Sequence, residues 1–459
     1  MKSNPQSWKL TDELFRFTAL KERVPFTLAN ACEGIISFGS IGSGKTSGPG
    51  TAIPLAMLRD GYGMLVLCAK LDEAERLREL AVLAGRENDI VMFGPEYPAR
   101  YNFLEDLLKG GSESVVKGFE QVTEAVLGKS EKNEWMLAAQ AHLRMGIEAF
   151  TLAGKPLRLP ELSLFLKSLD EQATLFKAVN APADPSRAMD YEVVKAYFMD
   201  SWAKRADETR ASVQMSLDPA LDPFCLGKMR ELFCTDTNIR PEDLRAGKII
   251  IVNVPILGEA DVLGKAAGVI WKYMVQRCLQ KFFGKAGMIR SSDSTRPVCI
   301  YVDECHYYST SYDATFQTTA RGALGITFYL TQTINNFWNA LGGQMPAKSQ
   351  TAGLLDTIQG ARIMCQNGSD ATYQWFMGIL GKELQSREGR SASFHGQGGG
   401  GASVSIQRDV LLDSRDFQVL AKGNKPFRYC VTAIIQVSGR TFRGGKIWTQ
   451  AAFPQIKKP

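Results

Sequence analysis

Histidine is scarce in this chain, and its nine cysteines include no CxxC pair. The three histidines, His142, His306 and His395, are far apart along the sequence. Because no cysteine or histidine cluster has the spacing of zinc ligands, we expect no structural metal. The odd number of cysteines and their apolar surroundings indicate buried, reduced thiols rather than a disulfide framework.

Long apolar runs are also missing. No stretch approaches the roughly 18 consecutive apolar residues of a membrane-spanning helix, and the first residues lack the apolar core of a secretory signal. We therefore expect no intrinsic membrane span and a cytoplasmic location. The chain has 459 residues and a net charge of +6. This length predicts two or three domains, and the charge permits a nucleic-acid partner without requiring one.

Short apolar runs alternate with helical patterns in two separate parts of the chain. In the first part, strands are predicted at 34–38, 63–68 and 89–93, and helices at 51–59 and 71–84. In the second part, strands are predicted at 248–257, 298–302, 326–330, 361–365 and 429–436, with a long helix at 261–283. This alternation is typical of a doubly wound, mainly parallel sheet, so the predicted class is α/β.

Residues 113–235 contain almost no strand signal and read as an inserted all-α domain. Helices are predicted at 114–127, 135–152 and 191–216, with Pro182, Pro185, Pro219 and Pro223 at the joints between helices. The predicted organisation is an N-terminal arm of helical character (1–23), a nucleotide-binding domain in two parts (24–112 and 236–459) and the insert between them. The Gly/Ser-rich segment 386–404 is expected to be a flexible loop.

A phosphate-binding loop follows the first predicted core strand. Residues 39–46 read GSIGSGKT and match the pattern GxxxxGK[ST], between an apolar run and a helix as that pattern requires. Glycines let backbone N–H groups turn toward a phosphate. Lys45 is expected to reach the β- and γ-phosphates, and the Thr46 hydroxyl to bind Mg²⁺. The expected nucleotide-binding residues are Gly39, Ser40, Ile41, Gly42, Ser43, Gly44, Lys45, Thr46 and Ser47.

Two carboxylates end the apolar run 298–302. Burying paired acids is costly unless a cation neutralises them, and in a P-loop enzyme that cation is Mg²⁺ with its waters. We therefore expect Asp303 to act at the metal and Glu304 to polarise the attacking water. The sequence predicts an NTP phosphohydrolase.

Gln332 and Arg321 are further candidates for catalysis. Gln332 closes the strand predicted at 326–330, and its amide could bond the γ-phosphate or the water; a polar strand cap is the alternative. Arg321 could neutralise transition-state charge at a neighbouring subunit. Arg362 and Arg387 are alternatives for that role. For each of these arginines, the other interpretation is a solvated surface residue without a catalytic role.

Several phrases resemble the conjugative coupling-protein family, the TraG/TraD-type ATPases of type IV secretion. They are GSIGSGKTSG (39–48), LVLCAKLDEAERL (65–77), VMFGPEYPARYNFLEDL (91–107), IYVDECHYY (300–308) and YLTQTINNF (329–337). The resemblance covers most of the chain beyond about residue 24. Members of this family usually begin with membrane-spanning helices, whereas this chain begins almost at the motor, so a soluble form without the N-terminal membrane region is expected.

The resemblance implies a RecA-like P-loop NTPase domain interrupted by an all-α domain, with ATP and Mg²⁺ as nucleotide and metal. It also implies a hexameric ring that recruits or translocates DNA, without reading its sequence, for conjugative transfer. Relaxosome or secretion-channel proteins are the implied partners and could bring the chain to the inner membrane. Two alternatives stay open, namely a nucleotide-gated platform that recruits proteins and a DNA pump of the FtsK/HerA type.

Overall fold

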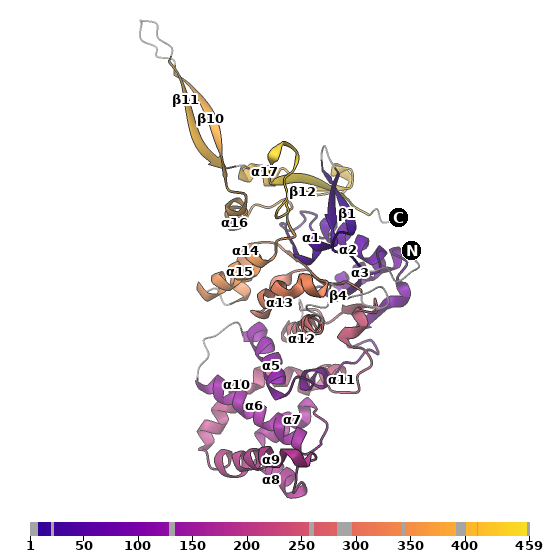
Figure 1. The fold of residues 1–459 in the computed structure, drawn as a ribbon, viewed down its shortest axis with the longest axis vertical. Coiled ribbons are helices and arrows are strands. Elements are labelled where there is room, and N and C mark those ends of the chain that lie inside the picture. The colour runs from indigo at the N-terminus through magenta and orange to yellow at the C-terminus, as the bar shows by residue number, and fades with distance from the viewer. Residues whose placement is uncertain are drawn as a thin grey trace.

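An eleven-stranded sheet forms the centre of the molecule (Figure 1), with the strand order β2-β1-β13-β12-β9-β3-β8-β7-β4-β6-β5. The computed structural model describes residues 8–19, 23–127, 134–256, 261–281, 296–341, 345–391, 401–410 and 412–456. All nine cysteines lie in these ranges and are free of disulfides, and seven of them are buried.

Seven neighbouring strands, from β9 to β5, pair in parallel. They are β3 (Ile35–Phe38), β4 (Gly63–Leu67), β5 (Ile90–Phe93), β6 (Ile249–Val252), β7 (Val298–Val302), β8 (Gly325–Thr331) and β9 (Ala361–Met364). All but the edge strand β5 are buried along their whole length, which explains their continuous apolar sequences. The predicted α/β class with a mainly parallel sheet is confirmed.

Four antiparallel strands extend the sheet beyond β9. They are β12 (Cys430–Gln436), β13 (Trp448–Pro454), β1 (Glu13–Ala19) and β2 (Arg23–Thr27). The helical character predicted for residues 1–23 is therefore wrong where the structure describes this arm. In β1 the buried residues include Leu14, Phe17 and Ala19, and the rings of Phe15 and Phe17 pack on Phe26 of β2. Those cross-strand ring contacts hold the segment in the sheet.

Helices cover both faces of the sheet. On one face, α1 (Leu28–Cys32), α2 (Pro49–Arg59) and α3 (Leu71–Leu83) pack in one apolar cluster. The other face is covered by helices whose bounds are α12 (Asp261–Gln280), α13 (Tyr312–Ala320), α14 (Ile334–Ala340), α15 (Met345–Thr357) and α16 (Asp370–Leu380). The short helix α17 (Ser414–Gln418) precedes β12.

A group of helices lies at one end of the molecule, below the sheet in Figure 1. Their bounds are α4 (Phe103–Leu108), α5 (Ser112–Leu127), α6 (Glu134–Leu152), α7 (Leu159–Lys167), α8 (Leu169–Ala178), α9 (Ala188–Ala196), α10 (Asp207–Cys225) and α11 (Gly227–Phe233). Their apolar side chains join the same core cluster as the sheet face covered by α12. The domain boundaries at 113 and 235 stay a prediction.

Two local expectations in these helices are wrong. Pro219 and Pro223 lie inside α10 rather than at joints. The helix predicted over 191–216 is interrupted, because α9 ends at Ala196, a π-helical turn covers Tyr197–Trp202, and α10 begins at Asp207. The Trp202 ring stacks on buried His142 with centroids 3.7 Å apart, so a tertiary contact accompanies the break.

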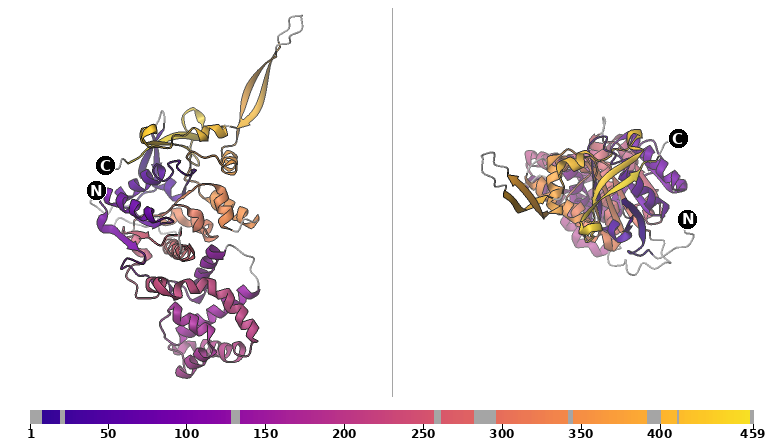
Figure 2. Two further views of the ribbon diagram at one scale, coloured as in Figure 1. Left: turned by 180° about the vertical axis from the view of Figure 1, so that it is seen from behind. Right: turned by 90° about the horizontal axis from the view of Figure 1, so that it is seen from above.

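A two-stranded hairpin projects from the other end of the molecule (Figures 1 and 2). It consists of β10 (Lys382–Ser391) and β11 (Gly401–Val410), paired in register from Lys382↔Val410 to Ser391↔Gly401. The prediction of a flexible loop at 386–404 is therefore wrong for both ends of that segment, which lie in β10 and β11. Backbone hydrogen bonds alone form such a ladder, so the strands need no apolar side chains. Residues 392–400 lie outside the described residues.

Candidate active site

The glycine-rich loop lies at the carboxyl end of β3, between β8 and β9. Gly42 and Gly44 have φ values of +72° and +86°, where glycine is strongly preferred. A Cβ added at Gly44 would lie 2.5 Å from Val431 Cγ2 of β12 and 2.7 Å from the Lys422 carbonyl oxygen. The loop is therefore shaped by the strand that packs on it as well as by its own sequence. Helix α2 begins at Pro49, two residues before the predicted start.

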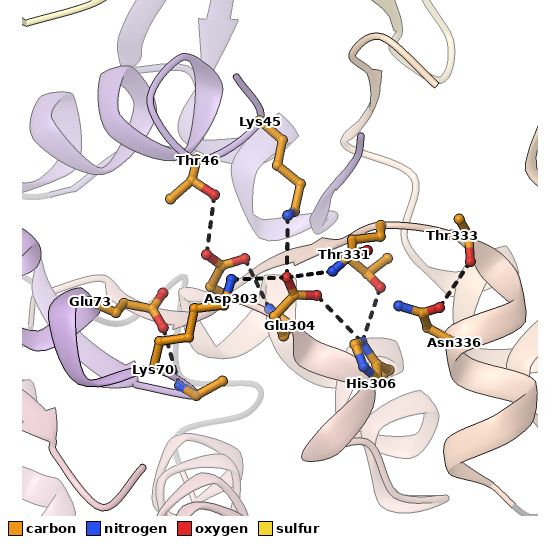
Figure 3. A network of polar contacts seen from close by, with 12 residues as sticks. Lys45, Thr46, Lys70, Glu73, Asp303, Glu304, His306, Thr331, Thr333 and Asn336 are labelled. Carbon is orange, nitrogen blue, oxygen red and sulfur yellow. Dashed lines mark hydrogen bonds and ion pairs between the residues drawn. The ribbon is translucent and has the colours of Figure 1, made fainter. Parts of the chain in front are cut away.

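The loop faces the two acids at the end of β7, as Figure 3 shows. Lys45 Nζ lies 3.4 Å from Glu304 Oε1, and Thr46 Oγ1 donates to Asp303 Oδ2 at 3.2 Å. Lys45, Asp303 and Glu304 are at most 6% exposed. More than 250 residues separate the loop from the acids in the sequence, yet parallel strands bring both to one edge of the sheet.

Several donors contact Glu304, and all of them contact the same one of its two carboxylate oxygens. Its Oε1 lies 3.0 Å from Gln332 Nε2 and 3.3 Å from Lys70 Nζ, in addition to the Lys45 contact. Its buried Oε2 has no hydrogen-bond partner among the described residues. Burial favours the neutral acid, but the charge of Lys45, the Gln332 amide and Lys70 together lower the pKa of Glu304 below its usual value. The carboxylate is thus ionised at neutral pH.

The Glu304 backbone adopts the left-handed region, with φ +46° and ψ +47°. A residue other than glycine is uncommon there and costs about 1–3 kcal/mol. The 3₁₀ turn Cys305–Tyr307 follows at once and includes His306. Burial lowers the pKa of His306 to about 4, against the opposing effect of Glu304, so its ring is neutral at pH 7.

Gln332 reaches the site from the end of β8, next to β7 in the sheet. The side chain of Asn367 donates to the Gln332 carbonyl oxygen at 2.9 Å and fixes its backbone. The Gln332 side chain therefore contacts Glu304. A glutamine that only capped the end of β8 would not contact this acid.

Arg321 lies away from these residues. It begins the 3₁₀ turn Arg321–Ala323, before the amino end of β8, and pairs with Glu33 Oε1 at 2.8 Å. Because β8 has seven residues at about 3.3 Å each, roughly 20 Å separates Arg321 from Gln332. Its side chain is 55% exposed, so the surface arginine faces outward from the opposite edge of the sheet. Arg362 is buried against Gln436, and the Arg387 side chain lies outside the described residues.

Sequence reasoning missed Lys70 and His306 as neighbours of Glu304. Lys70 follows β4, which pairs with β7, so the rule that located Gln332 also applies to Lys70. His306 Nδ1 lies 3.2 Å from Thr331 Oγ1 and 3.9 Å from Glu304 Oε2. Its position depends on the tight turn after Glu304, which no pattern in the sequence predicts.

The residues present suit a magnesium–nucleotide complex. The buried Ser43 hydroxyl has no hydrogen-bond partner among the described residues, which suits a group that meets a phosphate. Thr46 and Asp303 already lie within hydrogen-bond distance, and a hydroxyl and a carboxylate are the oxygen ligands that Mg²⁺ prefers.

Comparison with solved structures places this geometry in a known fold. The bacterial conjugative coupling protein TrwB, in its TrwBdeltaN70 form, superposes with a TM-score of 0.63 at 14% identity, over 96% of this chain and 89% of that chain. TrwB in complex with ADP and Mg²⁺ gives a TM-score of 0.63 at 12% identity, over 95% of this chain and 88% of that chain. This chain has the coupling-protein fold. The predicted resemblance to that family is confirmed at this level, including the RecA-like domain joined to an all-α region.

A further solved structure shares the fold more distantly. VirB4 of Thermoanaerobacter pseudethanolicus superposes with a TM-score of 0.52 at 11% identity, over 98% of both chains. No protein-family model and no curated protein sequence matches the chain. None of the helices in the described ranges combines the length and apolar character needed to cross a membrane.

Proposed function

We propose that this chain is an ATP-hydrolysing motor of the conjugative coupling type, which recruits or translocates DNA for type IV secretion. One observation carries the proposal. Lys45 and Thr46 meet Asp303 and Glu304 at the carboxyl edge of the sheet, within the fold of the coupling proteins. This constellation is what phosphoryl transfer to water needs, because catalysis there depends on positioning and charge neutralisation.

Each side chain has a distinct role in hydrolysis. Thr46 and Asp303 would hold Mg²⁺, which neutralises charge on the β- and γ-phosphates when it is bound. Lys45 exchanges its contact with Glu304 for one with the γ-phosphate. Glu304, ionised and then free of Lys45, accepts a hydrogen bond from the attacking water and directs it. Gln332 keeps its contact with Glu304 and positions the carboxylate.

Two substitutions test the roles of these side chains. Lys45→Ala should lower the rate of phosphate release by about 10²–10³-fold, as expected for loss of one transition-state donor. Glu304→Gln should retain nucleotide binding and slow cleavage by about 10²–10⁴-fold, as expected for loss of a general base. Wild-type turnover by Lys45→Ala, or lost nucleotide binding by Glu304→Gln, would contradict the assignment.

ATP as substrate and a hexameric ring are part of the proposal. TrwB has been solved with ADP and Mg²⁺, with a GTP analogue and with an ATP analogue. Phosphate release should therefore be compared with ATP and GTP side by side. Mass photometry with nucleotide and DNA should give a six-membered species, whereas a stable monomer would argue against a ring.

A nucleotide-gated recruitment platform is the second candidate, in which relaxosome or channel proteins bind the helical end of the molecule. The two candidates differ in their response to DNA. Stimulation of ATP hydrolysis by DNA at low salt supports the motor. Turnover that ignores DNA, together with tight protein binding, supports the platform. On either candidate we propose a cytoplasmic site of action, with partner proteins bringing the chain to the inner membrane.

A further inference from the structure

A polar cavity of about 340 Å³ lies behind the catalytic acids. Four elements line it: the end of α5, the start of α12, the segment after Glu304, and α14. Its polar lining residues are Lys265, His306, Tyr307, Ser309, Asn336 and Asn339. The described lining includes no residue of the phosphate-binding loop, and in Figure 3 His306 lies below Glu304 while Lys45 lies above it.

Among the described residues, the lining of the cavity contains one lysine and no carboxylate. This lysine, Lys265, forms no ion pair with any described residue. Lys265 Nζ lies 5.8 Å from the centre of the Tyr307 ring. A lysine that forms no ion pair with a described residue, beside hydroxyl and amide groups, suits a phosphate-bearing ligand.

The volume of the cavity and the aromatic ring of Tyr307 further restrict the class of ligand that fits. A volume of about 340 Å³ is near the lower end of the range of about 300–1,000 Å³ for ligand pockets, so the cavity has room for one nucleotide unit and none for a duplex. Tyr307 offers a ring on which any base can stack, as in proteins that bind single strands without reading sequence.

We propose that this cavity binds one nucleotide unit of a single DNA strand, with its phosphate at Lys265, and that His306 relays occupancy of the cavity to Glu304. The inference rests on the proposed function, because it supplies the contact through which DNA would stimulate hydrolysis. The ring of His306 lines the cavity and also lies 3.9 Å from Glu304 Oε2, an oxygen with no hydrogen-bond partner among the described residues. A shift of the ring toward that oxygen reorients the carboxylate.

The binding test compares two lysines that lie over tyrosine rings at nearly the same distance. Lys265 is in the cavity, and Lys195, 5.7 Å from the Tyr191 ring in α9, is the matched control far from it. Binding of a fluorescein-labelled oligothymidylate is measured against salt concentration, with the active site saturated by a non-hydrolysable ATP analogue. For each phosphate contact that is lost, the slope of log K against log salt falls by about 0.7.

The expected result is a shallower slope for Lys265→Ala and an unchanged slope for Lys195→Ala. Equal slopes for Lys265→Ala and wild type overturn the cavity assignment and leave the motor proposal standing. Wild type that binds no oligothymidylate overturns both. Thymidine monophosphate serves as a competitor: if it binds as tightly as the strand and also needs Lys265, the cavity is a free-nucleotide site and the strand assignment falls.

The relay is tested by His306→Leu, which keeps bulk at the position and removes the ring nitrogens. Because His306 is neutral, the salt slope of strand binding should stay as in wild type. The ratio of DNA-stimulated to basal hydrolysis should fall to about one. Retained stimulation, or a proportional loss of both rates with an unchanged ratio, overturns the relay, since a purely structural role would lower both rates together.

Discussion

Removing the Lys70 side chain should weaken the contacts that position the Glu304 carboxylate and shift the pH dependence of hydrolysis. Lys70 Nζ lies 3.3 Å from Glu304 Oε1, but its side chain is 43% exposed, so solvent screens the pair. Half-exposed ion pairs of this kind contribute about 1 kcal/mol at most. If that contribution is lost entirely from the transition state, kcat falls about fivefold in Lys70→Ala.

The direction of the pH effect follows from the positive charge of Lys70. Lys70 helps to lower the pKa of Glu304, so Lys70→Ala raises it. A carboxylate with a higher pKa takes up its proton earlier as the pH falls. The acidic limb of the pH–rate profile should therefore move to higher pH, while Lys70→Arg, which keeps the charge, should restore most of the wild-type profile.

A matched control exists in the same chain. The side chain of Lys109 is 61% exposed and pairs with the buried Asp106, so it is a lysine–carboxylate pair of the same kind away from Glu304. Steady-state phosphate release across pH for Lys70→Ala, Lys70→Arg and Lys109→Ala separates the local effect from a general loss of charge. A profile of Lys70→Ala that superimposes on that of Lys109→Ala would refute the idea that Lys70 positions the base.

Three further outcomes are expected. Gly44→Ala should lower stability by about 1–3 kcal/mol and impair nucleotide binding, because the new methyl group meets β12 at a backbone φ of +86°; thermal unfolding measures the first effect and nucleotide titration the second. Asp313→Asn should cost about 3–5 kcal/mol in denaturant unfolding, because Lys272 and Asp313 pair at 2.5 Å with both side chains 1% exposed. Arg321→Ala should lose hydrolysis, and mixing it with Lys45→Ala should restore part of the rate if the arginine acts across subunits; no recovery on mixing would contradict that role.

The sequence by itself determined the local chemistry of the strands and of the loop between β3 and α2. Runs such as IIIV (249–252) and VCIYV (298–302) are apolar throughout because both faces of a central parallel strand are buried. The phosphate-binding loop has a fixed spacing and needs glycines at positive φ, so Gly42 and Gly44 could be recognised without coordinates. The meeting of Lys45 with Glu304 could also be predicted, since parallel strands end at one edge.

Tertiary structure decided the pairing of β1 and the neighbours of Glu304. These interactions join segments that are distant in sequence, and no sequence pattern within either segment predicts them. The strand β1 alternates too weakly to be recognised and is held by the rings of β2 and the backbone of β13. The Lys70 and His306 contacts with Glu304 depend on which strands are neighbours and on the turn after β7. Arg321 lies only a few residues before β8 in sequence, but it stands at the amino end of that strand, so the seven residues of β8 separate it from the edge where Lys45 meets Glu304.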